Sequence, residues 1–192
     1  MKYSVVRLAA FVVTAASVLV ACESPLNLEG VQASQAAPIR RGDLFQQAAS
    51  SDKALVVVGN HGLVLRSVDA GTTWNRQEIP GWPSLIGIAA CPNGQFAALA
   101  TEGEVLVSAD DGQTWASNPI QTEESPQGIT CDPRNRLWVV GSFTTIIVSD
   151  DAGKNWEDHS IGDDTILTTI QFIDAEHALI FGEFGFNVHS ED

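Results

Sequence analysis

The sequence predicts an all-β protein, a β-propeller of four-stranded antiparallel blades, and three observations lead to this prediction. First, one pattern recurs every 41 residues along most of the 192-residue chain. Second, each repeat holds four short segments rich in Val, Ile, Thr and Trp, separated by turn residues, as β-strands are. Third, a period of about 40 to 45 residues is typical of propeller blades, whereas helical repeats of about 33 or 34 residues are shorter.

The repeat is marked by the motif Ser-x-Asp-x-Gly-x-[Thr/Asn]-Trp. Complete copies begin at Ser67, Ser108 and Ser149, and a fourth begins on schedule at Ser190 and reaches Asp192. The register holds without insertion or deletion, so blades are expected at 44–84, 85–125, 126–166 and 167–192. The motif positions are Ser67, Asp69, Gly71 and Trp74, then Ser108, Asp110, Gly112 and Trp115, then Ser149, Asp151, Gly153 and Trp156.

Each motif residue has a structural task between the third and fourth strands of a blade. Glycine supplies a positive φ in a tight hairpin at no steric cost. The aspartate and serine can accept backbone N–H bonds inside the turn, and the tryptophan can cover the hairpin or the neighbouring blade. The spacing also differs from that of a calcium loop. The motif is therefore interpreted as structural, neither catalytic nor metal-binding.

These segments resemble the Asp-box, or BNR, repeat of sialidase-type propellers. The longer context at 59–74, GNHGLVLRSVDAGTTW, resembles bacterial lipoproteins related to photosystem II stability and assembly factors. The resemblance covers about residues 44–192 and implies a propeller with an assembly or stability role. The sequence departs from the family pattern at Ala100 and Thr144, which replace glycines, at Asn155, which replaces the box Thr, and at Asn187, which replaces Val or Ile.

The N-terminus has the pattern of a secretory signal. Lys2 and Arg7 precede an apolar run at 8–21, which is too short for a comfortable membrane span. The run ends in Leu-Val-Ala-Cys, which resembles the lipobox of bacterial lipoproteins and predicts lipidation of Cys22. We therefore expect a signal peptide at 1–21, a flexible tether at 22–43 and a lipid-anchored protein facing the periplasm, at the outer membrane.

Charge limits the possible partners. Twenty-four acidic residues against ten basic ones give a net charge of −14, which argues against nucleic acid or an anionic membrane surface. The basic pair Arg40-Arg41 in the tether is interpreted as solvated linker charge. The hydrophobic fraction of 44% is enough for a packed core.

Catalytic and metal-binding patterns are weak. Sialidases use a tyrosine nucleophile, and cleavage of the signal would remove Tyr3, the only tyrosine. The acidic runs at 123–124 and 163–164 are interpreted as solvated surface, although a fragment of another Asp-box glycoside hydrolase stays open as the alternative. The four histidines show no metal-ligand spacing. No cofactor or metal is expected.

Two cysteines, Cys91 and Cys131, occupy nearly equivalent turns of adjacent blades, 40 residues apart instead of 41. In an oxidising periplasm they could form a disulfide. An offset of one residue reverses the face of a side chain in a strand, so two free buried thiols are the alternative.

The sequence also suggests where a partner could bind. Propeller ligands usually meet the face opposite the Asp-box turns, which here includes His61, Trp82, Glu102, Phe143 and Phe184. Exposed aromatic residues there would suit a protein or peptide partner. Trp82, between two prolines, could instead plug a blade junction. The prediction is a non-catalytic propeller that binds or scaffolds other envelope proteins.

Length adds one more expectation. Residues 44–192 make up about 3.6 repeats, whereas propellers usually have about 4 to 8 blades. We therefore expect an incomplete propeller, truncated from one of six to eight blades.

Overall fold

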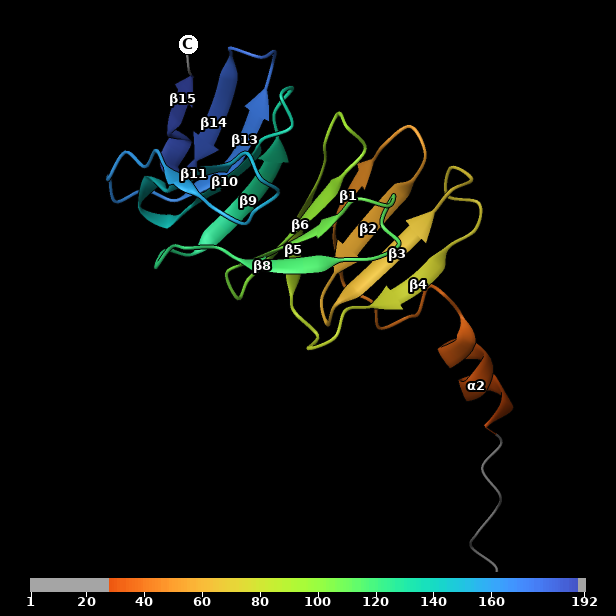
Figure 1. Ribbon diagram of the computed structural model, residues 1–192. Coiled ribbons are helices and arrows are strands. Elements are labelled where there is room, and N and C mark those ends of the chain that lie inside the picture. Colours follow the sequence, from red (N-terminus) through yellow and green to blue (C-terminus); the bar gives the residue numbers. More distant parts are fainter. Residues whose placement is uncertain (1–27, 190–192) are drawn as a thin grey trace, which may run out of the picture. The chain divides into compact units, whose positions relative to one another are not determined.

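The computed structural model describes residues 28–189, and its region from Pro38 onward consists of separate antiparallel sheets (Figure 1). The strands of each sheet follow one another in chain order. The first three sheets have four strands and the fourth has three within the described residues. This confirms the all-β class and the four-stranded blade. The strands are β1 (Phe45–Ser50), β2 (Leu55–Gly59), β3 (Leu63–Ser67) and β4 (Asn75–Glu78) in blade 1; β5 (Leu85–Ala90), β6 (Phe96–Ala100), β7 (Glu104–Ser108) and β8 (Ala116–Pro119) in blade 2; β9 (Pro126–Cys131), β10 (Leu137–Gly141), β11 (Ile146–Ser149) and β12 (Glu157–Asp158) in blade 3; and β13 (Leu167–Phe172), β14 (Ala178–Gly182) and β15 (Asn187–His189) in blade 4.

The core lies between successive blades. One cluster joins blades 1 and 2 around Val58, Val64 and Phe96, all fully buried. Two further clusters join blades 2 and 3 and blades 3 and 4. Because neighbouring sheets cover both faces of the second strand of an inner blade, β6 is buried along its whole length and its sequence shows no polar alternation.

Each blade begins with the same irregularity in its first strand. The pairing of the first and second strands shifts by one residue after Phe45, Leu85 and Leu167, and beside Gly141 in blade 3. At this point the backbone of the first strand comes very close to the second. A Cβ on Gly182 would lie only 2.7 Å from the carbonyl oxygen of Ile166. Gly59, Gly141 and Gly182 occupy equivalent positions of the 41-residue repeat, where Ala100 stands in blade 2, and they mark this repeated bulge.

The blades have two distinct edges. The ends of β1, β5, β9 and β13 line one cavity together, so these first strands run in the same direction. We call the side where they end the Asp-box edge, and the opposite side the loop edge. The Asp-box edge comprises the turns at 51–54, 91–95, 132–136 and 173–177 with the Asp-box turns; the loop edge comprises the turns at 60–62, 101–103, 142–145 and 183–186 with the connections at 79–84, 120–125 and 159–166.

The segment predicted to be a flexible tether contains an α-helix, α2 (Glu29–Ala36). The prediction that Arg40 is only a solvated charge is wrong, because its Nη1 lies 3.2 Å from Oε1 of Glu78. The sequence around Arg40 could not show this pair, since the partner lies 38 residues further on. No helix within 28–189 is long and apolar enough to span a membrane. The predicted signal peptide at 1–21, Cys22, Ser190 and Asp192 lie outside the described residues.

Candidate functional site

The Asp-box turns are held by the residues that define the motif. In the first turn, the Ser67 hydroxyl donates to Oδ1 of Asp69 at 2.8 Å and accepts from the Gly71 N–H at 2.8 Å. Asp69 also accepts from the backbone N–H and the hydroxyl of Thr73, at 2.8 and 2.6 Å. These bonds, the one from the Thr73 hydroxyl foremost, lower the pKa of Asp69 to about 2. The aspartate is therefore an ionised acceptor at neutral pH.

The other two boxes repeat this arrangement, including at the position where the sequence departs from the pattern. Asp110 accepts from the backbone and hydroxyl of Thr114 at 2.8 and 2.6 Å. In the third box Asn155 replaces threonine, and its Nδ2 donates to Oδ2 of Asp151 at 2.6 Å. The bond from Thr114 and the bond from Asn155, respectively, contribute most to lowering the pKa of Asp110 and Asp151 to about 2. The substitution keeps the hydrogen bond.

The second and third Asp-box turns also fasten their blades to the one before. Arg66 of β3 donates through Nε to the Asp111 carbonyl at 2.6 Å, and Gln77 of β4 donates to the Gly112 carbonyl at 3.2 Å. One repeat later, Asn118 donates to the carbonyl of Ala152 at 3.0 Å. The motif is thus committed to the turn and to the blade junction, which supports its structural interpretation.

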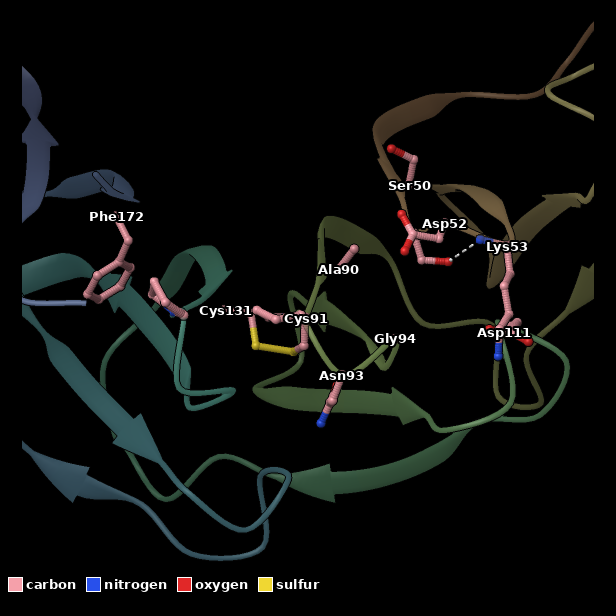
Figure 2. A pocket seen from close by; sticks show the side chains of 13 residues that line it. Ser50, Asp52, Lys53, Ala90, Cys91, Asn93, Gly94, Asp111, Cys131 and Phe172 are labelled. Carbon is pink, nitrogen blue, oxygen red and sulfur yellow. Dashed lines mark hydrogen bonds between the residues drawn. A yellow bond between two sulfur atoms is a disulfide. The ribbon is translucent and has the colours of Figure 1, made fainter. Parts of the chain in front are cut away.

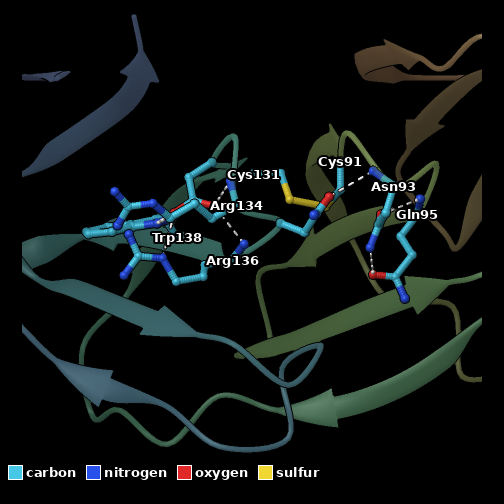
Figure 3. The surroundings of a disulfide bond; sticks show 9 residues. Cys91, Asn93, Gln95, Cys131, Arg134, Arg136 and Trp138 are labelled. Atoms are coloured by element: carbon cyan, nitrogen blue, oxygen red, sulfur yellow. Dashed lines mark hydrogen bonds and ion pairs between the residues drawn. A yellow bond between two sulfur atoms is a disulfide. The ribbon is translucent and has the colours of Figure 1, made fainter. Parts of the chain in front are cut away.

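A disulfide joins blades 2 and 3 on the Asp-box edge, between Cys91 and Cys131 (Figure 3). The offset of one residue does not prevent it, because Cys91 follows the end of β5 and lies in a turn, where strand alternation no longer applies. Cys131 is the last residue of β9. The same two turns are also joined by the Asn93 N–H, which donates to Oδ1 of Asn135 at 2.8 Å.

The disulfide lines a cavity of about 570 Å³ (Figure 2). Its wall comes from the first turn of three blades, from the second Asp-box turn and from the end of β13. The charged side chains in this wall are those of Asp52, Lys53 and Asp111. A second cavity, of about 580 Å³, is lined by the first strands of all four blades. Its lining side chains are all uncharged and include Gln47 of β1 and Gln127 of β9.

The sequence analysis did not single out one buried carboxylate, that of Asp132. Asp132 is almost completely buried and accepts from the backbone N–H groups of Arg134 and Arg136. It also accepts from Nε of Arg136 at 2.6 Å and from the Trp138 indole at 3.2 Å. Burial alone would raise the pKa of Asp132, but these bonds outweigh burial and hold it below its ordinary value. The Asp-Pro sequence of this turn was the available signal.

The predicted partner residues all lie on the loop edge, where three aromatic rings are exposed. The exposed fractions are 68% for Trp82, 52% for Phe143 and 98% for Phe184. Trp82 therefore does not plug a blade junction, which was the alternative. His61 and Glu102 are also exposed. The loop edge thus presents large apolar surface to solvent.

Four of these residues have left-handed backbone conformations. The φ angles are 59° at His61, 54° at Trp82, 51° at Phe143 and 54° at Phe184. Such angles are unfavourable for bulky side chains and persist only where the surrounding structure imposes them. Glu102 does not share this conformation. Its carboxylate accepts a long hydrogen bond, 3.4 Å, from the backbone N–H of Ser84.

The described carboxyl groups offer little support for acid catalysis. Each carboxyl pKa that departs from its ordinary value is lowered: Asp69, Asp110, Asp132, Asp151, Asp158 and Asp174. A general acid in glycoside hydrolysis requires the opposite shift. Within the described part of the chain, no three His, Cys, Asp or Glu side chains gather as a metal site would require.

Comparison with known proteins shows that part of the chain is similar to one family. Residues 119–189 match the family model described as photosynthesis system II assembly factor YCF48. A YCF48 structure bound to D1 peptide has a similar fold, with a TM-score of 0.62 and 20% sequence identity, over 81% of this chain and 53% of that one. This chain thus spans about half the length of that structure. No curated protein matches the sequence significantly.

Two other solved structures share the fold. A catalytically inactive virginiamycin B lyase from Staphylococcus aureus with quinupristin has a TM-score of 0.58 and 17% identity, over 80% of this chain and 57% of the lyase. The computationally designed Ika4 protein has a TM-score of 0.63 and 14% identity, over 79% and 92%. At these identities the likeness concerns the fold. The chain is therefore an Asp-box propeller that resembles the YCF48 type.

Proposed function

We propose that this chain is a non-catalytic propeller that binds a segment of another protein on its loop edge, as an assembly or stability factor does. The observation that carries the proposal is the exposure of Trp82, Phe143 and Phe184 on one edge. Burial of these solvent-exposed rings against a partner would be favourable, and aromatic residues are enriched at protein interfaces.

Two further observations support a binding role. The Asp-box residues, which are the most regular feature of the sequence, are engaged in turns and blade junctions. The YCF48 structure that shares this fold is bound to D1 peptide, so a propeller of this kind can accept a peptide. The loop edge is the proposed place for such a segment here.

Site-specific photocrosslinking tests the proposal. A photoreactive phenylalanine analogue replaces Phe184 in the full chain, and adducts are identified by mass spectrometry. The matched control carries the analogue at Ile173, which is 67% exposed but lies on the Asp-box edge. We expect a defined protein adduct from position 184 and none from position 173. The same analogue is also placed at positions 143 and 82. Equal labelling from positions 184 and 173, or no adduct from any of positions 184, 143 and 82, would overturn the proposal.

The proposal extends to location. The lipobox-like sequence before Cys22 supports a lipid anchor that holds the propeller at the bacterial cell envelope, facing the periplasm. The test is metabolic labelling with a radioactive fatty acid, together with fractionation. We expect Cys22→Ser to abolish the label and to release the protein from the membrane fraction. Retention of the label in this variant would contradict the anchor without affecting the binding proposal.

A further inference from the structure

An apolar patch crosses from blade 3 to blade 4 on the loop edge. It consists of Phe143, Ile161, Ile166 and Phe184, with exposed fractions of 52, 47, 36 and 98%. Backbone bonds connect the two parts of the patch through the 159–166 connection: the Thr144 N–H donates to the Thr165 carbonyl at 2.8 Å, and the Glu183 N–H donates to the Ile166 carbonyl at 3.0 Å. The patch is therefore one surface formed by two blades.

Two acidic segments are bonded to the turn that carries Phe143. On one side, Oε2 of Glu124 accepts from the Ser142 hydroxyl at 2.7 Å, which fixes the 123–124 acidic pair against the Phe143 turn. On the other side, the Asp163 N–H donates to the Thr144 hydroxyl at 2.9 Å, which fixes the 163–164 acidic pair against the same turn. The turn that carries Phe143 is thus bonded to both acidic segments, through its neighbours Ser142 and Thr144.

Three of these carboxylates have no partner of their own. Within 28–189, the side chains of Glu123, Asp163 and Asp164 make no hydrogen bond or ion pair, and all three residues are exposed. The connections and turns on the loop edge of blades 2 to 4 contain no Lys or Arg. The basic residues of these blades are Arg134, Arg136 and Lys154, and all of them lie on the Asp-box edge. The loop edge of these blades therefore carries acidic residues without Lys or Arg beside them, whereas the Asp-box edge carries residues of both signs.

We infer that the occupant of this patch is a cationic, apolar protein segment, in which lysine or arginine residues alternate with large aliphatic or aromatic ones. This inference rests on the proposed function and names the class of partner. The apolar side chains of the partner segment cover the rings of Phe143 and Phe184, and its lysine or arginine residues contact the acidic pairs at 123–124 and 163–164. An arginine or lysine above the Phe143 ring also gains a cation–π contact. An acidic segment would be repelled by the same carboxylates.

The inference is tested with synthetic peptides and the full chain, by fluorescence anisotropy at several salt concentrations. One peptide alternates lysine with leucine, a second has glutamate in place of lysine, and a third has serine in place of leucine. We expect only the first to bind well, with an affinity that falls about tenfold between low and high salt. Equal or tighter binding of the glutamate peptide would overturn the inference.

Variants separate the patch from general effects of charge and folding. The double variant Phe143→Asn with Phe184→Asn removes both rings and introduces a residue that tolerates the left-handed φ of these positions. We expect it to weaken peptide binding at least about 30-fold. Asp163→Asn with Asp164→Asn should weaken it several-fold and reduce its dependence on salt. The control Asp52→Asn with Asp150→Asn removes the same charge from the Asp-box edge. An equal loss in this control would overturn the inference.

The inference and the proposed function fail in different ways. If the photocrosslink at position 184 captures a defined protein whose contacting segment is acidic or uncharged, the proposed function stands and the inference is wrong. If no adduct forms on the loop edge and no peptide binds, both are wrong. Binding of the lysine–leucine peptide that the variants at Phe143 and Phe184 leave unchanged would place it elsewhere, which also overturns the inference.

Discussion

Arg66 of blade 1 donates a 2.6 Å hydrogen bond to the backbone carbonyl of Asp111, in the Asp-box turn of blade 2. The side chain is half-buried, and its Cδ packs near the Cα of Gly112, where an added Cβ would lie 3.7 Å away. The Asp-box turn is thus a joint between blades as well as a hairpin within one.

The joint predicts a loss of stability when Arg66 is replaced by methionine, which keeps the apolar stem but cannot donate. Leaving the Asp111 carbonyl without its charged donor should lower the free energy of unfolding by about 1.5–3 kcal/mol. Urea denaturation measures this change. Arg41→Met is the matched control, since Arg41 is exposed, and its effect should stay within about 0.5 kcal/mol. Equal effects would mean that the joint contributes nothing.

Within the turn, the buried serine of the motif should matter most. Ser108 is 1% exposed, and its hydroxyl accepts from the Gly112 N–H at 2.9 Å while donating to Asp110 at 2.8 Å. Ser108→Ala leaves a buried N–H without a partner and should cost about 1–3 kcal/mol of unfolding free energy. Ser50→Ala, at an exposed position, serves as the control in the same thermal and urea measurements. A neutral Ser108→Ala would show that the motif serine is dispensable.

The aspartates of the boxes predict acid sensitivity. Their pKa values lie at about 2, below the ordinary 3.8. A lowered native pKa means that the unfolded chain binds protons first, so the stability from these groups is present above about pH 4–5 and is lost as the pH falls towards 2. Stability measured in urea from pH 7 to pH 2 should fall in this window. Asp110→Asn should be less stable at pH 7 and show a shallower fall; an unchanged slope would contradict this origin.

The sequence predicts the blades well because their signals are local and repeated. The motif at Ser67 and its two later copies set the hairpins, and the recurrence of glycine at Gly59 and Gly141 reflects the bulge. Contacts between blades are harder to predict, since they join residues that share no local pattern. The bond from Arg66 to the next blade depends on how the sheets pack, which the periodicity does not specify. The ion pair of Arg40, which joins the segment before blade 1 to β4 of that blade, has no local pattern either.

The predicted partner face shows the same division. The sequence places Phe143 and Phe184 on the loop edge, because the spacing of 41 residues fixes their equivalent turns. It does not show that Trp82 is exposed or that Phe143 has a left-handed backbone. Both residues lie beside bonds between a turn and the next connection, from the Gly62 N–H to the Pro83 carbonyl and from the Thr144 N–H to the Thr165 carbonyl.

The disulfide predicts that reducing conditions weaken the junction of blades 2 and 3. Cys91 and Cys131 close a loop of 40 residues, for which the chain-entropy model gives about 4 kcal/mol. Replacing both cysteines by serine should lower the free energy of unfolding by up to this amount and remove the effect of dithiothreitol on the melting temperature. Wild-type protein that melts at the same temperature with and without reductant would contradict the prediction.

At Phe143 we expect stability and partner binding to favour different residues. Its φ of 51° places a large side chain in the left-handed region, and half of the residue remains in water. Asparagine and glycine tolerate this conformation, so Phe143→Asn should raise the free energy of unfolding by about 1 kcal/mol. Phe172 is the matched control, because its ring packs against Trp138 with centroids 5.2 Å apart, and Phe172→Asn should be destabilising. If Phe143→Asn stabilises the fold and also abolishes the crosslink or peptide binding, the strained ring is retained for the partner. If the variant unfolds more easily than the wild type, the ring supports the turn, and its exposure has a structural cause.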